Sequence, residues 1–78
     1  MPRKIRQLMT DLRRAGFVEL PRRGKGSHSV WEHPTYPEIP VVTLAGQLGE
    51  DAKLYQERDV RNALARVKGR ERDNDYER

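Results

Sequence analysis

Residues 5–20 read IRQLMTDLRRAGFVEL, and this stretch predicts a helix that is followed by a strand. Its apolar residues recur at the helical spacing i, i+3, i+4 and i+7, as Ile5, Leu8, Met9 and Leu12. Gly16 follows where a left-handed residue would end the helix, so we expect a helix over residues 3–15. Residues 17–20 predict a short strand that stops at Pro21, because proline lacks a backbone donor.

The next segments predict two further strands. Residues 22–26 contain two glycines and predict a turn, and residues 27–33 predict the second strand. One face of that strand would carry His28, Val30 and Glu32, and the other face would carry Ser27, Ser29, Trp31 and His33. Neither face is cleanly apolar, so the alternation does not determine which side is buried. Prolines mark the next connection, and residues 39–44 predict a third strand.

A second amphipathic helix is expected over residues 52–68, where the apolar positions are Leu54, Val60, Ala63, Leu64 and Val67. The sequence therefore predicts an α+β fold of order αβββα, with a three-stranded antiparallel sheet and both helices on one face. We expect one domain over residues 1–69. Residues 70–78 have no apolar face, and they predict a charged, disordered tail.

The composition restricts the expected cellular location and the class of binding partner. The 78 residues include no cysteine and no apolar run long enough to span a bilayer, so we expect a cytoplasmic protein without disulfides or a membrane segment. The net charge is +4, and residues 1–30 carry eight Lys or Arg against two acidic residues. This asymmetry favours contact with a nucleic-acid backbone. A basic helix on a membrane surface is the weaker interpretation, because the first helix offers no aromatic residue to insert.

The candidate chemistry centres on Gly26-Ser27-His28, which follows the basic residues Arg22, Arg23 and Lys25. Histidine titrates near neutral pH and can act as a general acid or base. From the residues alone, however, an exposed strand histidine without a role is the simpler interpretation of His28. His33, beside Pro34 at the strand end, is expected to be exposed and passive. A zinc site from the two histidines matches no known ligand spacing, so no metal is expected.

With these elements in place, the chain resembles the HicA (YcfA-like) toxins of type II toxin-antitoxin modules. The resemblance rests on the segments at residues 14–18, 24–28 and 31–34, with Gly26-Ser27-His28 as the most specific part. It implies a fold similar to double-stranded-RNA-binding domains and metal-independent cleavage of messenger RNA without a cofactor. It also implies that His28 is the catalytic residue and that a HicB-like antitoxin is the partner. Residues 42–46 depart from the family, since many members have a proline and a histidine after the third strand.

In that function, Arg22, Arg23 and Lys25 would orient the phosphate, and Ser27 would add a hydroxyl hydrogen bond. The 2′-hydroxyl of RNA would be the nucleophile, so the expected products carry a 2′,3′-cyclic phosphate and a 5′-hydroxyl. Two other functions stay open. One is a non-catalytic RNA-binding module of the same fold, and the other is an interaction protein whose basic half meets an acidic partner. The sequence does not determine the oligomeric state.

Overall fold

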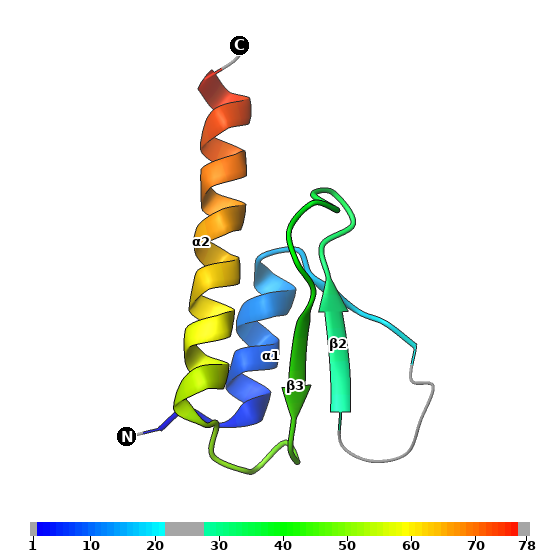
Figure 1. The fold of residues 1–78 in the computed structure, drawn as a ribbon, viewed down its shortest axis with the longest axis vertical. Helices are drawn as coiled ribbons and strands as arrows, with labels where there is room; N and C mark the ends of the chain where they lie inside the picture. Colours follow the sequence, from blue (N-terminus) through cyan, green and yellow to red (C-terminus); the bar gives the residue numbers. More distant parts are fainter. Residues whose placement is uncertain (1, 22–27, 77–78) are drawn as a thin grey trace.

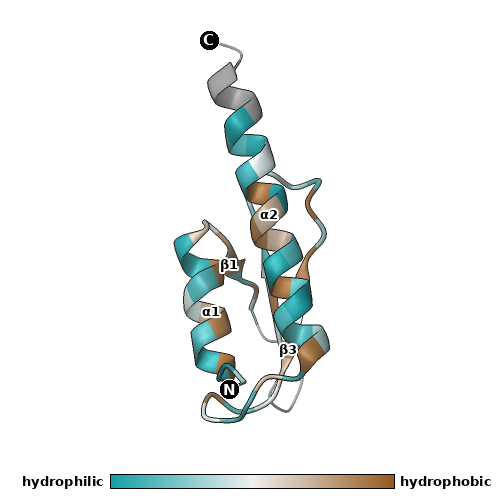
Figure 2. Cartoon of the chain, turned by 90° about the vertical axis from the view of Figure 1, so that its left-hand side faces the viewer, coloured by the Kyte–Doolittle hydropathy of each residue, from teal (hydrophilic) through white to brown (hydrophobic). Residues whose placement is uncertain are grey.

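The computed structural model describes residues 2–21 and 28–76, and it shows a three-stranded sheet covered by two helices. In chain order the elements are α1 (Ile5–Arg14), β1 (Val18–Glu19), β2 (His28–Glu32), β3 (Val42–Ala45) and α2 (Leu54–Tyr76). The strands are antiparallel in the order β1-β2-β3. Both helices lie on the same side of the sheet, and α2 extends well beyond it (Figures 1 and 2). The predicted α+β fold of order αβββα is confirmed.

The first helix follows its sequence pattern closely. Its four buried residues are the predicted stripe of Ile5, Leu8, Met9 and Leu12. At its C-terminal end Gly16 has a φ of 102°, and the Gly16 N–H donates to the Arg13 carbonyl at 3.0 Å. The Phe17 N–H donates to the Leu12 carbonyl at 3.0 Å, which completes a Schellman cap and turns the chain toward the sheet.

The sheet register decides which face of β2 is buried. Ser29 lies opposite Leu44, and Trp31 lies opposite Val42, and all four are buried against the helices. Trp31 is 0% exposed, and its Nε1–H donates to Ser29 Oγ at 2.9 Å, so the indole and the hydroxyl satisfy each other. His28 and Thr43 belong to the opposite, open face of the sheet.

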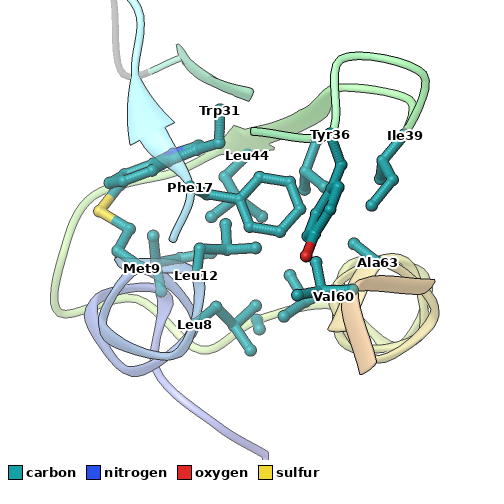
Figure 3. Close-up of a cluster of buried hydrophobic side chains, with 14 residues drawn as sticks. Leu8, Met9, Leu12, Phe17, Trp31, Tyr36, Ile39, Leu44, Val60 and Ala63 are labelled. Atoms are coloured by element: carbon teal, nitrogen blue, oxygen red, sulfur yellow. The ribbon is translucent and has the colours of Figure 1, made fainter. Parts of the chain in front are cut away.

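One apolar core fills the space between the sheet and the helices (Figure 3). Phe17, Trp31 and Leu44 from the sheet side meet Leu12 from α1 and Val60 from α2. Phe17, which we expected in the first strand, belongs instead to the turn after α1, and β1 is only two residues long. The connection after β2 adds Tyr36 and Ile39 to the core, because tertiary packing buries them without a strand pairing them.

The C-terminal helix is longer than the sequence predicted. We expected it to end near residue 68 and a disordered tail to follow, whereas the backbone is helical through Tyr76. A physical reason lies at Arg70, whose Nε pairs with Glu38 Oε2 at 2.8 Å and whose guanidinium lies 5.7 Å from the Tyr36 ring centre. These contacts attach the helix beyond Gly69 to the connection between β2 and β3.

Candidate functional site

His28 opens β2 and is exposed. It lies opposite Ala45 of β3, on the face of the sheet that the helices leave open. Because side chains alternate along a strand, the buried Ser29 and Trp31 require His28 to point away from the core. The strand therefore presents the imidazole to solvent on a backbone that the core holds in place.

A groove of about 540 Å³ runs along the outer edge of β3, and His28 forms part of its wall. The connection before β3 and the strand itself provide a largely apolar side, and α2 provides a polar side. The α2 side consists of Tyr55, Asp59, Asn62, Ala63 and Arg66. The groove thus brings a phenol, an amide, a carboxylate and a guanidinium from α2 next to the edge of β3, and His28 borders it from the open face.

Sequence reasoning missed the α2 side of this groove. Residues 55, 59, 62 and 66 follow the helical spacing i, i+4, i+7 and i+11, so one face of the predicted helix carries them all. That regularity was the available signal. What the sequence did not contain was the pairing of this face with the edge of β3, which depends on how α2 crosses the sheet.

The predicted phosphate contacts involve four residues. Arg22, Arg23, Lys25 and Ser27 lie outside the described residues, and in the chain they precede His28 by one to six positions. Their arrangement around His28 stays a prediction.

Several other cations of the basic N-terminal half have partners inside the protein. Arg3 pairs with Asp11 at 2.9 Å, and Lys4 pairs with Asp51. The Arg13 guanidinium lies 5.0 Å from the centre of the Trp31 ring and covers it. These residues therefore also have structural roles, and they contribute less free positive charge than the residue count suggested.

His33 is a core residue, and the expectation that it would be exposed was wrong. It is 6% exposed, and its ring lies edge-on to Phe17 with 5.1 Å between the ring centres. Its Nε2 lies 2.8 Å from the Ala15 carbonyl oxygen, and its Nδ1 lies 3.3 Å from the Tyr36 backbone N. A carbonyl only accepts and a backbone N–H only donates, so Nε2 carries the proton and Nδ1 accepts. Both ring nitrogens are therefore occupied within the fold.

Gly16 makes this arrangement of His33 sterically feasible. A Cβ atom built at residue 16 would lie 2.7 Å from His33 Nε2. The glycine therefore has two functions, because it adopts the positive φ of the helix cap and it leaves room for the imidazole. The histidine in turn connects the end of α1 to the connection after β2.

Among the described residues, no group of three or more His, Asp or Glu is arranged to hold a metal ion. None of the helices in the described part of the chain is both long and apolar enough to cross a bilayer. Comparisons with protein-family models, with curated proteins and with solved structures gave no match for this chain.

Proposed function

We propose that this protein is a metal-independent RNA endonuclease in which His28 is the catalytic acid or base. The observation that supports this best is the position of His28, which is exposed on the open face of the sheet and lies three positions after Lys25, the last residue of a basic segment of the chain. An accessible imidazole on a strand that the core holds in place meets the geometric requirement for proton transfer to a bound substrate. The resemblance to the HicA toxins motivates the choice of messenger RNA as the substrate.

RNA contains its own nucleophile, which limits what the protein must supply. His28 would remove the proton from a 2′-hydroxyl, and the oxygen would attack the adjacent phosphorus while the bond to the 5′-oxygen breaks. The leaving 5′-oxygen would take a proton from water, and the His28 imidazolium would return its proton to solvent. Arg22, Arg23 and Lys25 would stabilise the charge on the phosphate, and Ser27 would donate a hydrogen bond to it. The products would be a 2′,3′-cyclic phosphate and a 5′-hydroxyl.

Because His33 is buried, the proposed mechanism uses one histidine, His28. His28 and His33 are five residues apart on an extended segment, and they lie on opposite sides of it. A single acid–base group contributes about 10²–10⁴-fold to a rate, so we expect a slow nuclease. In the same proposal the protein is the toxin of a toxin-antitoxin module, and a HicB-like antitoxin would be its inhibitor.

The test is the cleavage of a single-stranded RNA in the presence of EDTA, with analysis of the fragment ends. Wild type should cut and leave cyclic-phosphate ends, and His28→Ala should not cut. Thr43→Ala is the matched control, because it changes another exposed residue of the open face, on the neighbouring strand. It should cut like wild type. Equal cutting by wild type and His28→Ala, from separately purified folded samples, would refute the role of His28.

Intact RNA with all three proteins would refute the nuclease proposal. Duplex and single-stranded RNA binding would then be measured by fluorescence anisotropy. Tight binding without cutting would support the RNA-binding module instead.

A further inference from the structure

The outer edge of β3 has unpaired backbone groups. The Leu20 N–H donates to the Val30 carbonyl at 2.8 Å, so the backbone groups of Val30 point toward β1. Thr43 lies opposite Val30 across the β2–β3 pair, and its N–H and C=O must therefore point away from β2. Within the described part of the chain, no group bonds to this N–H or C=O. A strand edge of this kind is a template for another strand.

Gln56 confirms the direction of the edge and also limits it. Its Nε2–H donates to the Ala45 carbonyl at 2.8 Å, from the α2 side. Ala45 is two residues after Thr43, so its backbone groups point the same way. The carbonyl at the end of the strand is therefore occupied by the protein itself, whereas Thr43 is open.

The groove beside this edge has the form of a peptide site. A strand would lie on one side of an added segment and a helix on the other, an arrangement that several peptide-binding domains use. Val41 is 53% exposed and Tyr55 is 48% exposed, and both line the groove, so apolar surface is available for an added strand to cover. Its volume of about 540 Å³ lies within the range of ligand sites.

The charges of the α2 side favour a polypeptide over RNA. Asp59 and Arg66 are seven residues apart, which is about 10 Å along a helix. They cancel in net charge, and the Asp59 carboxylate would repel a phosphate backbone. A strand rises about 3.3 Å per residue, so 10 Å corresponds to about three residues. A segment with a basic and an acidic side chain two or four residues apart, on one face, would complement both charges.

A second copy of this chain fits the groove poorly. Two copies paired antiparallel through β3 would place their strands about 4.8 Å apart and would bring both α2 helices to the same side of the joined sheet. Packed helices need 8–10 Å between their axes. Because α2 contacts β3 and also forms the groove wall, the two helices would collide. A single extended peptide segment has no helix, so it would avoid this collision.

We propose that the groove between β3 and α2 binds an extended peptide segment of a partner protein, which adds a fourth strand to the sheet at Thr43 and matches Asp59 and Arg66 with a basic and an acidic side chain. This binding surface does not depend on whether the protein cuts RNA. The segment's main chain would exchange hydrogen bonds with Thr43, and the side chains of its two faces would meet Val41 on one side and Tyr55 on the other.

The probe is a displayed library of random ten-residue peptides, selected on the full-length protein, with the enriched peptides then synthesised. Thr43→Pro removes the outward N–H without removing a bond to β2, and Thr43→Ala retains the N–H and serves as its matched control. We expect Thr43→Pro to weaken binding by about tenfold or more and Thr43→Ala to leave it within about twofold. In wild type, NMR should show slowed exchange of the Thr43 amide when peptide is added. The enriched peptides should contain an acidic and a basic residue. Arg66→Glu should weaken the binding of these peptides.

Three results would each overturn the proposal. The first is a selection in which no peptide is enriched above the bare support. The second is equal peptide binding by Thr43→Pro and wild type, and the third is a Thr43 amide that exchanges equally fast with and without peptide. This last readout uses unchanged protein, so it decides the question even if Thr43→Pro does not fold. Single-stranded RNA is the comparison ligand. If RNA and not peptide shifts the resonances of Thr43, Tyr55 and Arg66, the groove is a nucleic-acid site.

Discussion

Substitution of Gly16 by alanine should destabilise the fold through two separable effects. The first is the positive φ of 102°, which costs a residue with a Cβ about 1–2 kcal/mol. The second is the new Cβ at 2.7 Å from His33 Nε2. The imidazole is buried and has a partner on each nitrogen. Moving it would break one or two hydrogen bonds, each of which contributes about 0.5–1.5 kcal/mol to stability. We therefore expect Gly16→Ala to lower the free energy of unfolding by about 1.5–5 kcal/mol.

A double-mutant cycle with His33→Ala separates the two effects. When the imidazole is absent, the clash disappears and Gly16→Ala should cost only the backbone term. The coupling free energy between the two sites should then be about 0.5–3 kcal/mol. Urea unfolding can be followed by the fluorescence of Trp31, the only tryptophan, which is 0% exposed in the folded state. With a slope of about 1 kcal/mol per molar urea, a loss of 2 kcal/mol lowers the midpoint by about 2 M.

An equal free-energy cost of Gly16→Ala with and without His33 would refute the predicted clash. That result would mean that the methyl group and the imidazole do not meet. A cost below about 0.5 kcal/mol in the wild-type background would also refute the strained cap. Osmolytes that strengthen burial can bring the double variant into a measurable range, because they stabilise all four proteins of the cycle.

Three further predictions concern the core and its boundary. Long-range ¹H–¹⁵N NMR should find His33 as the tautomer with the proton on Nε2, and a proton on Nδ1 would contradict the two bonds described above. Leu12→Ala should cost about 2–5 kcal/mol in urea unfolding because Leu12 is 0% exposed, whereas Leu54→Ala should stay within about 0.5 kcal/mol because Leu54 is 84% exposed. Arg70→Ala should speed amide exchange in the last turns of α2, since Arg70 attaches this part of the helix to the connection between β2 and β3. Arg72→Ala is its matched control, because the described residues offer Arg72 no ion pair; equal effects of the two variants would refute the role of Arg70.

The parts of the fold that the sequence predicted well are those with local causes. The stripe of α1 and its glycine cap depend on residues within one or two turns of each other, and both are confirmed. The order of the elements followed from such local signals, together with the need to bury two helical stripes on one sheet.

The parts that the sequence did not predict depend on partners far along the chain. Ser29 and His33 are polar and yet lie on the buried face, because the Trp31 indole and the Ala15 carbonyl satisfy them. No alternation pattern contains that information. In the same way, α2 continues beyond Gly69 because of contacts with Glu38 and Tyr36, and the groove exists because one face of α2 meets the edge of β3.

The two histidines have different roles because their side chains lie on opposite sides of one extended segment. Residues 28 and 33 differ by an odd number, so an extended backbone directs their side chains to opposite sides. The core occupies both nitrogens of His33, and this imidazole helps to fix the strand that presents His28. A polar residue inside the core thus gives the exposed histidine a defined backbone, although His33 itself cannot reach a ligand on the open face. If His28 acts on RNA, His33 would contribute by positioning β2, and its removal would lower activity only as far as it unfolds the protein.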